Sequence, residues 1–518
     1  MKFWVNKSTD LKGAGGQLLV VPCFSGDFAD EVALESHSFA QMNELTGSNL
    51  LSQARGEAFD GANGAHVMQF LDDRFAAGKV MLLGLGKRSA VTADTLKAAF
   101  ASAFKQVKAS KAAEVTFDAK PILADGLFGA YELGQLLAIN ARVVGHTLKN
   151  YKTKAGGAKA DVRLDTLRVL TEAEHQDDVK RGLYAGRSIG YGVNLARDLI
   201  TTPAGELTPM RLMDVAKGIE ARSQGLVKGT YYWGKRLKEL GANALIAVGQ
   251  GSAEPPVLIE LDYTPPTGPT KTVLCLIGKS VTFDSGGLDL KPAEGMREMK
   301  RDMSGGATVL GALQAIIDLK LPISVKVVMA ATENMTGSRA YKPGDVIKSL
   351  NGLTIEVDNT DAEGRLTLAD AIEYAKRRNV THMVDFATLT GAVVSIGGDV
   401  GAACFGNNAQ FTKTVRETAA SQGEKMLEMP MWPELRSLID SDIADLKNSG
   451  GRLAGSTTAA MFLKEFAGDE IPWVHVDIAG VAFRGRELEG LPKGATGYGV
   501  RTAVALASVL AQEAAAQS

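Results

Sequence analysis

Cysteine and histidine are scarce in this 518-residue chain, and their positions exclude several common kinds of site. The three cysteines, Cys23, Cys275 and Cys404, are odd in number and far apart in sequence, so no disulfide framework is predicted. Isolated thiols of this kind fit a reducing compartment. The six histidines never approach one another at metal-ligand spacing, and no His-Glu-x-x-His segment occurs. A zinc site built on histidine pairs is therefore not expected.

The chain also lacks a long apolar run and a strong net charge. No run reaches the roughly 18 apolar residues that would span a bilayer, and the first residues lack the apolar centre of a secretion signal. The 57 Lys and Arg residues nearly balance the 59 Asp and Glu residues, which leaves a formal charge of −2. No global basic field therefore points to nucleic acid. We expect a soluble cytoplasmic protein without a membrane partner.

Short apolar runs that alternate with helical patterns predict an α/β fold class. Gln17–Phe24 and Val80–Leu85 have the pattern of buried strands, and a helical pattern follows at Asp94–Val107. This alternation predicts a smaller N-terminal α/β domain over residues 1–165. A long helical pattern then predicts a connecting helix within residues 166–198.

Residues 199–518 are expected to form a larger C-terminal domain. Its predicted strands are continuous apolar runs, as expected when helices cover both faces of a mostly parallel central sheet. The predicted strands are Ala244–Val248, Val257–Leu261, Thr272–Ile277, Ser324–Ala330, His382–Phe386 and Val474–Ile478.

Two carboxylates lie two residues apart in the segment NTDAEGRL, residues 359–366. In an irregular or extended segment, residues i and i+2 project the same way, so Asp361, Glu363 and Arg365 can converge on one pocket. Two acids so close repel each other unless a positive charge lies between them, and a divalent cation would supply that charge. The alternative is an acidic first turn of a helix, which complements the helix dipole. The segment alone leaves both interpretations open.

Further charged residues follow a predicted strand, where ligands bind in open α/β sheets. The Gly-rich segment 278–291 contains Lys279, Asp284 and Lys291, and Asp302 comes shortly afterwards, before a Gly-rich opening into a helical pattern. The alternative for Asp302 is a helix cap, and the alternative for both lysines is a solvated surface.

A serine nucleophile is only weakly supported, because Ser285 lies in Asp-Ser-Gly-Gly rather than in Gly-x-Ser-x-Gly. The remaining polar constellation contains four acids, which suffice to hold two divalent cations, and three cations that could orient a substrate. It consists of Asp284, Asp302, Asp361 and Glu363 with Lys279, Lys291 and Arg365.

Seven motifs, six of them in the larger domain, carry a specific resemblance. They are NLARDLITTPAGELTP (194–209), GKSVTFDSGGLDLK (278–291), MKRDMSGGA (299–307), ENMTGSRAYKPGD (333–345), NTDAEGRL (359–366), DFATLTGA (385–392) and DIAGVAF (477–483). In these motifs the chain resembles the leucine (cytosol) aminopeptidase family of two-metal exopeptidases. Gly205, Ser280 and Thr336 depart from the family pattern without touching a proposed ligand. The resemblance implies that residues 199–518 are the catalytic domain.

The resemblance also implies two metal ions, Mn or Zn, that share ligands. Lys279, Asp284, Asp302 and Glu363 would hold the tightly bound ion. Asp284, Asp361 and Glu363 would hold the exchangeable ion, with Asp361 also lending its backbone carbonyl. A lysine can ligate a cation only as the neutral amine, so Lys279 needs a lowered pKa.

Catalytic and binding roles follow from the same resemblance. Lys291 would polarise the scissile carbonyl, and Arg365 would hold a bicarbonate ion that takes the proton from a metal-bridging water. Met299, Thr388 and Gly391 would line the pocket for the first side chain. The implied activity is removal of N-terminal residues from peptides, with a preference for leucine and other bulky apolar residues. The implied assembly is a homohexamer.

Two other functions stay open. Some members of this family also act as DNA-binding regulators, and the N-terminal domain could do so through the basic clusters Lys105–Lys120 and Lys149–Lys159. Ordinary surface lysines are the favoured explanation of these clusters, so DNA is a partner that the sequence allows without favouring. A metal-dependent phosphoesterase is the other alternative, because two-metal carboxylate sites also serve that chemistry.

Overall fold

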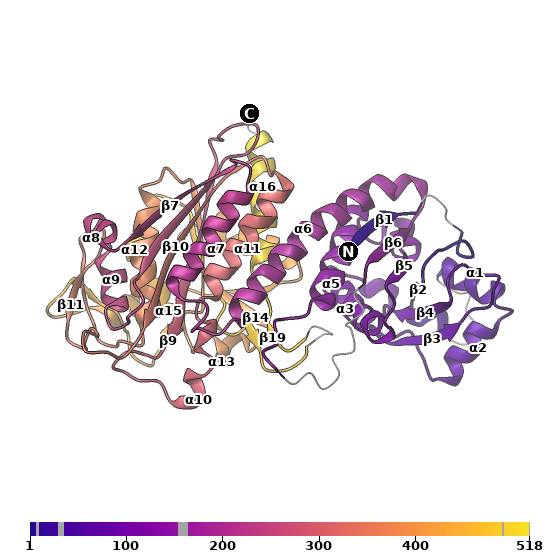
Figure 1. Ribbon diagram of the computed structural model, residues 1–518, viewed down its shortest axis with the longest axis horizontal. Helices are drawn as coiled ribbons and strands as arrows, with labels where there is room; N and C mark the ends of the chain where they lie inside the picture. The colour runs from indigo at the N-terminus through magenta and orange to yellow at the C-terminus, as the bar shows by residue number, and fades with distance from the viewer. Residues whose placement is uncertain (7–9, 29–35, 154–163, 489–491, 517–518) are drawn as a thin grey trace. The chain divides into compact units, whose positions relative to one another are not determined.

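The computed structural model describes the chain except for residues 7–9, 29–35, 154–163, 489–491 and 517–518 (Figure 1). The chain divides into two compact units, the first of which comprises Met1–Tyr191 and Arg486–Lys493. The second comprises Gly192–Gly485 and Gly494–Ser518. Among the described residues, no helix is both long and apolar enough to cross a membrane.

The first unit contains a six-stranded sheet in the order β1-β6-β5-β2-β4-β3. All neighbouring strands pair in parallel except β3, which is antiparallel to β4 at one edge. The strands are β1 (Lys2–Val5), β2 (Leu18–Cys23), β3 (His66–Phe70), β4 (Lys79–Gly84), β5 (Glu114–Asp118) and β6 (Thr166–Leu170). Both strands predicted in this region, β2 and β4, are confirmed.

In the described part of this unit, five α-helices and the start of a sixth accompany the sheet. They are α1 (His37–Leu45), α2 (Asn49–Gly56), α3 (Ala93–Ser110), α4 (Lys120–Leu123), α5 (Ala130–Gly145) and α6 (Gln176–Thr201). Helix α3 begins where Thr92 and Thr95 form a capping box, which supplies partners for two backbone N–H groups of its first turn. Its apolar face, including Phe100 and Phe104, packs into the core of the unit.

Residues 166–198, predicted as a connecting helix, contain a strand as well as a helix. The segment Thr166–Leu170 is strand β6, which pairs with both β1 and β5. Helix α6 begins only at Gln176 and continues to Thr201, so residues from both units lie in it. The alternating pattern of β6 is too short to distinguish a strand from a helical turn by sequence. The division into separately folding domains stays a prediction.

The second unit contains an eight-stranded sheet in the order β15-β14-β17-β13-β9-β10-β8-β7. The four central strands β17, β13, β9 and β10 run parallel to one another, and antiparallel pairs lie toward both edges. The strands are β7 (Val227–Trp233), β8 (Val257–Tyr263), β9 (Val273–Asp284), β10 (Ser324–Asn334), β13 (His382–Ala387), β14 (Gly401–Gly406), β15 (Lys425–Glu428) and β17 (Trp473–Asp477). The mostly parallel sheet is therefore confirmed.

Helices cover both faces of this sheet (Figure 1). Cys275 and Ile277 of β9 belong to one buried cluster with residues of α9, α12 and α15, whereas α11 packs on β9 and β13 and against α16. The helices are α7 (Pro209–Arg222), α8 (Lys235–Leu240), α9 (Asn243–Gly249), α10 (Ala293–Met296), α11 (Ser304–Leu319), α12 (Glu363–Lys376), α13 (Val394–Gly397), α14 (Ala409–Ser421), α15 (Gly455–Ala467) and α16 (Val500–Ala516). The predicted α/β fold class is confirmed for both units.

Among the described residues, two small sheets also belong to the second unit. They are β11 (Val346–Lys348) with β12 (Thr354–Glu356) and β16 (Leu446–Lys447), and β18 (Phe483–Arg484) with β19 (Gly494–Ala495).

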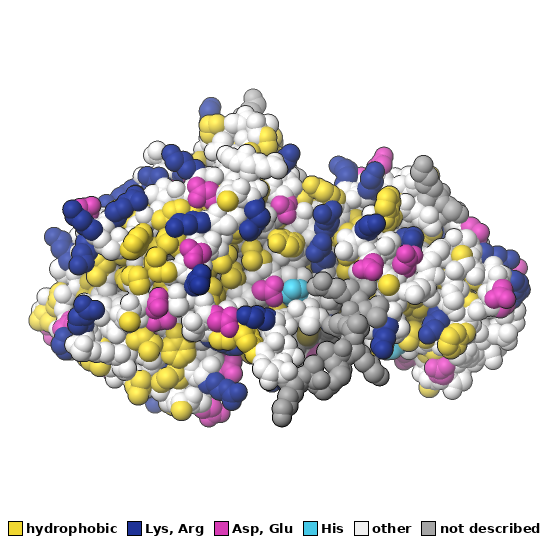
Figure 2. Space-filling view, in the orientation of Figure 1, with side chains coloured by type: hydrophobic (Ala, Val, Ile, Leu, Met, Phe, Trp, Pro, Cys, Tyr) yellow, Lys and Arg dark blue, Asp and Glu magenta, His cyan; other side chains and the backbone are white. Residues whose placement is uncertain are grey.

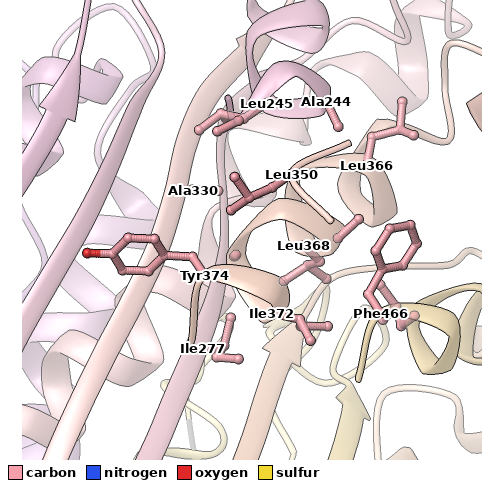
Figure 3. Close-up of a cluster of buried hydrophobic side chains, with 14 of the residues drawn as sticks. Ala244, Leu245, Ile277, Ala330, Leu350, Leu366, Leu368, Ile372, Tyr374 and Phe466 are labelled. Carbon is pink, nitrogen blue, oxygen red and sulfur yellow. The ribbon is translucent and has the colours of Figure 1, made fainter. Parts of the chain in front are cut away.

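One predicted strand is wrong. Ala244–Val248 forms helix α9, and Ala244 and Leu245 lie in the same buried cluster as Leu350 and Leu366 (Figure 3). A short continuous apolar run is compatible with a buried helix as well as with a strand, and its neighbours in the fold decide between them. Here Gly241, in the left-handed conformation, ends α8 and lets the chain turn directly into α9.

Candidate metal centre

The candidate site lies where the four central parallel strands end. Asp284 is the last residue of β9, Asn334 is the last residue of β10, and Asp477 is the last residue of β17. Thr388 follows the last residue of β13. The carboxyl ends of parallel strands meet at one edge of a sheet, which is where ligands bind in this class of fold.

The turn before helix α12 brings Asp361 and Glu363 to this edge. The backbone N–H of Asp361 donates to Asn359 Oδ1 at 2.7 Å, which fixes the turn, and Glu363 is the first residue of the helix. Carboxylate oxygens of Asp284, Asp361 and Glu363 lie within 4.8 Å of one another. Glu363 therefore lies in a helix first turn and in an acid cluster at once, so the two interpretations of the segment do not exclude each other.

Lys279 joins a fourth acid to this cluster. Its Nζ lies 2.8 Å from Asp302 Oδ2 and 2.8 Å from Glu363 Oε1, and it donates to the backbone carbonyl of Thr388 at 2.9 Å. Its side chain is only 3% exposed, so the surface alternative is wrong for this lysine. The side chain passes directly over Gly364, where an added Cβ would lie 2.4 Å from Lys279 Cε. Only glycine leaves room for this path.

Lys291 and Asp302 also contact the acid cluster, so neither has the alternative role considered for it, a solvated surface for Lys291 and a helix cap for Asp302. Lys291 Nζ lies 2.9 Å from Asp284 Oδ2 and forms a second ion pair with Asp361, and its side chain is 16% exposed. Asp302 does not cap helix α11, because Met303 occupies the cap position without a side-chain hydrogen bond. Asp302 instead accepts a hydrogen bond from Thr388 Oγ1 at 2.8 Å.

Burial and mutual repulsion shift the pKa values of these groups. Burial, reinforced by Glu363, raises the pKa of Asp284 to about 6 although both lysines oppose the shift. For Glu363, burial raises the pKa, but Lys279 and Lys291 outweigh burial and lower it below its ordinary value. Burial lowers the pKa of each lysine, but the surrounding carboxylates outweigh burial and raise it. Both lysines are therefore ammonium groups in this arrangement.

The donor set fits divalent cations. Three carboxylate oxygens of the cluster are buried, and among the described residues they pair only with the lysine ammonium groups. These oxygens are Asp302 Oδ2, Asp361 Oδ1 and Glu363 Oε1. Carboxylate oxygens are the ligands that Mg²⁺ and Mn²⁺ prefer, and Zn²⁺ also accepts them. A cation among these acids would also lower the pKa of Lys279. The lower pKa is needed because lysine binds a metal only as the neutral amine.

Metal binding should weaken as the pH falls through about 6. Asp284 carries a proton below its pKa of about 6 in the cation-free protein, and a cation must displace that proton. Because Lys279 must also lose its proton to bind a cation, we expect the apparent Mn²⁺ affinity to fall about tenfold per pH unit from pH 7.5 to pH 6, and more steeply below pH 6, where Asp284 is protonated as well. Mn²⁺ titrations at pH 5, 6 and 7.5 measure this. An affinity that stayed constant down to pH 5 would contradict it.

Arg365 lies beside the acid cluster, and its guanidinium group has one buried N–H without a hydrogen-bond partner among the described residues. Its Nη1 donates to the backbone carbonyl of Asn448 at 2.8 Å, whereas the buried Nε has no hydrogen-bond partner among the described residues. Burial lowers the pKa of Arg365 to about 10, and Glu363 and Asp477 oppose this shift. The group stays a cation at neutral pH, so its free donor fits a small anion such as bicarbonate.

The three predicted pocket residues lie on two segments. Met299 begins a single 3-10 turn just before Asp302 and is half-buried. Thr388 touches Asp302 directly, and Gly391 lies three residues further along the same loop. A Cβ added to Gly391 would meet no atom within 4 Å, so this glycine borders open space.

Sequence reasoning did not single out two asparagines that organise the site. Asn334 Nδ2 donates to Asp284 Oδ1 at 2.9 Å and to the carbonyl of Thr360 at 3.0 Å, which joins the two acid-bearing segments. Asn448 accepts the N–H groups of Asp358 and Asn359 through Oδ1, at 2.8 and 3.2 Å. The available signals were the position of Asn334 four residues after the predicted strand Ser324–Ala330 and its place in the motif ENMTGSRAYKPGD.

Comparisons with known proteins agree with this architecture. Residues 194–504 match the cytosol aminopeptidase family, catalytic domain, and residues 20–155 match the N-terminal domain of the same family. The chain is 37% identical over 483 residues to a probable cytosol aminopeptidase of Geobacter sp. (strain M21), which covers 93% of this chain and 95% of the relative. It is also 37% identical over 494 residues to a probable cytosol aminopeptidase of Aquifex aeolicus (strain VF5), which covers 95% of each chain.

Two solved structures share the fold over nearly the whole chain. A mutant of tomato leucine aminopeptidase superposes with a TM-score of 0.87 at 30% identity and covers 98% of this chain and 96% of its own. The bottromycin maturation enzyme BotP in complex with Mn superposes with a TM-score of 0.82 at 32% identity and covers 96% of this chain and 100% of its own.

The matches define the class of protein as an aminopeptidase, a hydrolase that acts as an exopeptidase. The chain belongs to the cytosol aminopeptidase family, which is metal-dependent. The family predicted from the seven motifs is thereby confirmed.

Proposed function

We propose that this protein is a two-metal leucyl aminopeptidase that removes leucine and other bulky apolar residues from peptide N-termini. The observation that carries the proposal is the group of Asp284, Asp361 and Glu363, whose carboxylate oxygens lie within 4.8 Å of one another. Such a group of acids, linked to Asp302 through Lys279, offers the carboxylate oxygens that hard divalent cations prefer as ligands.

The proposed ligands are those implied by the family resemblance. Lys279, Asp284, Asp302 and Glu363 would hold one ion, and Asp284, Asp361 and Glu363 the other, with Mn or Zn as the candidate metals. When bound, divalent cations would lower the pKa of water and polarise the scissile carbonyl. BotP was solved in complex with Mn, which supports Mn as a candidate here.

Two cationic side chains would act on the substrate directly. We propose that the ammonium group of Lys291 stabilises the negative charge that develops on the carbonyl oxygen in the tetrahedral transition state. It lies against Asp284 and Asp361, which hold it at the edge of the acid cluster. We propose that Arg365 holds bicarbonate, which its unpaired buried Nε supports.

Assembly, location and a DNA contact stay proposals. A homohexamer and a cytoplasmic location rest on the family, and light scattering that gave a monomer would exclude the hexamer. DNA is not favoured, because Lys105 is ion-paired with Glu487 at 2.7 Å and acidic side chains are interspersed with basic ones on the face in Figure 2. Part of the other basic cluster, Lys149–Lys159, lies outside the described residues. A gel shift at physiological salt tests the DNA contact.

Chelation should inactivate the protein without unfolding it. Lys279 and Lys291 form ion pairs with the acid cluster. When the cations are removed, these ammonium groups still offset the repulsion between the carboxylates, so the fold is kept. We expect leucine anilide hydrolysis to disappear after exhaustive chelation while the circular dichroism spectrum stays native. Added Mn²⁺ should restore activity.

The same experiment separates peptidase from phosphoesterase chemistry. Mn²⁺-loaded protein is assayed with leucine anilide and with phenyl phosphate in parallel. Cleavage of the anilide alone supports the proposal. Cleavage of the phosphate alone, or anilide cleavage that survives exhaustive chelation, would show that the proposed function is wrong.

A further inference from the structure

Asp477 is a buried carboxylate outside the proposed ligand set that collects donors from the loop after β13. It is 1% exposed and lies beside Ala387 in the pairing of β17 with β13. Its Oδ2 accepts the backbone N–H of Thr390 at 3.1 Å and the hydroxyl of Thr390 at 2.7 Å. Its Oδ1 accepts the backbone N–H of Leu389 at 3.1 Å.

The same carboxylate also holds the chain that follows β17. Asp477 Oδ1 accepts the backbone N–H of Ala479 at 3.2 Å, so one oxygen receives donors from two separate loops. The hydroxyl of Thr390 lies 2.8 Å from Ser456 Oγ, which ties the first loop to helix α15 as well. No donor in this set is a cation, so the loops supply the hydrogen bonds to the buried carboxylate, whereas His475 and Arg365 interact with it through their charge.

The loop held by Asp477 reaches the candidate metal centre at its first residue. Thr388 donates through its hydroxyl to Asp302 at 2.8 Å, and its carbonyl accepts from Lys279 Nζ at 2.9 Å. Its other end is Gly391, which borders open space. The loop therefore extends from the acid cluster to the proposed pocket for the first side chain, and Asp477 anchors its middle.

We propose that Asp477 is a positioning residue that sets the size preference for the substrate's first side chain. It holds the loop Thr388–Gly391 against the segment at Ala479. The proposal rests on the proposed aminopeptidase function, because the pocket is defined by that function. Asp477 itself touches neither the substrate nor a proposed metal ligand, so it acts through the loop.

The chemistry of the carboxylate makes the proposal testable with a nearly isosteric change. An ionised Asp offers two acceptor oxygens, whereas Asn offers one oxygen and one NH₂ donor. In Asp477→Asn, whichever way the amide turns, an NH₂ group faces at least one backbone N–H, either that of Thr390 or those of Leu389 and Ala479. The loop must then move away from the carboxamide.

The test compares kcat/KM for leucine anilide and alanine anilide on the full-length, Mn²⁺-loaded protein. A displaced loop loses contact with a large side chain more than with a methyl group. We therefore expect Asp477→Asn to lower the leucine-to-alanine ratio about tenfold, the equivalent of one or two hydrogen bonds. Most of the change should appear in KM for leucine anilide, and bound Mn²⁺ should match the wild type.

Glu424→Gln is a matched control. Glu424 is also buried and accepts two backbone N–H groups and a threonine hydroxyl, from Gly499 and Thr502 at the start of α16. This change should lower thermal stability without altering the leucine-to-alanine ratio. An unchanged ratio in Asp477→Asn, or an equal change in Glu424→Gln, would overturn the proposal.

Thr390→Val is a second, milder variant. It removes one hydroxyl donor to Asp477 and keeps the backbone N–H, so it decides the question if Asp477→Asn does not fold. A lowered leucine-to-alanine ratio supports the proposal, and an unchanged ratio overturns it. If the wild type cleaves neither anilide, the proposed function itself fails, which is a different outcome from an unchanged ratio.

Discussion

Glu363→Ala should lose bound metal and peptidase activity together. Glu363 is fully buried, contributes an oxygen to the three-carboxylate group, and lies 2.8 Å from Lys279 Nζ. Without it, Asp284 and Asp361 are the only members of that group left to hold a cation. We expect metal content to fall well below the wild type and kcat/KM for leucine anilide to fall by at least about 10³, since the metal contribution amounts to several kcal/mol.

Glu373→Ala on the same helix is the matched control. Glu373 pairs with Lys376 and Arg377 at the outer side of α12 and has no contact with the acid cluster. Elemental analysis and anilide kinetics on both variants separate a local effect from a general weakening of the helix. If Glu363→Ala kept full metal occupancy, Glu363 would be only an acid in a helix first turn.

Lys291→Ala should lose catalytic rate and keep its metal. The ammonium group is proposed to stabilise the oxyanion of the transition state, so its loss should lower kcat by about 10² to 10³, the usual cost of one such donor. KM should stay near the wild-type value, because the interaction forms mainly in the transition state. Lys291 pairs with Asp284 and Asp361 in the cation-free protein, so its removal should not weaken metal binding.

Lys279→Ala provides the contrast. Lys279 bridges Asp302 and Glu363, and as a proposed ligand its loss should weaken binding of the tighter metal. Metal titration of the two variants therefore separates the two lysines. A normal kcat in Lys291→Ala, or a loss of metal equal to that of Lys279→Ala, would remove Lys291 from its proposed role.

The acids and lysines of the site could be predicted because each lies in a short polar, Gly-rich segment. The ends of buried strands are recognisable in sequence, and the fold rule for parallel sheets then brings those segments to one edge. Lys279 shows the limit of this reasoning. Sequence alone allowed a solvated lysine, and only the fold encloses it between Asp302, Glu363 and the carbonyl of Thr388.

The supporting residues could not be predicted, because their partners are distant along the chain. Asn334 donates to Asp284 across 50 residues, and Arg365 donates to the carbonyl of Asn448 across 83 residues. Asp477 receives the N–H of Thr390 across 87 residues. Helix α9 was mistaken for a strand for a related reason, since the buried cluster around it decides its conformation.

Helix α12 also bears on how this chain can change over evolutionary time. Every residue from Glu363 to Ala375 is buried except Glu373. The first turn serves the metal centre, while Leu366, Leu368 and later residues fill the core of the second unit (Figure 3). A substitution in this helix must therefore be tolerated by the core packing and must also leave the first turn in place. A change in this helix must satisfy two requirements, the packing of the core and the geometry of the first turn. We therefore expect the sequence to diverge more slowly here than in helices that only pack against the core.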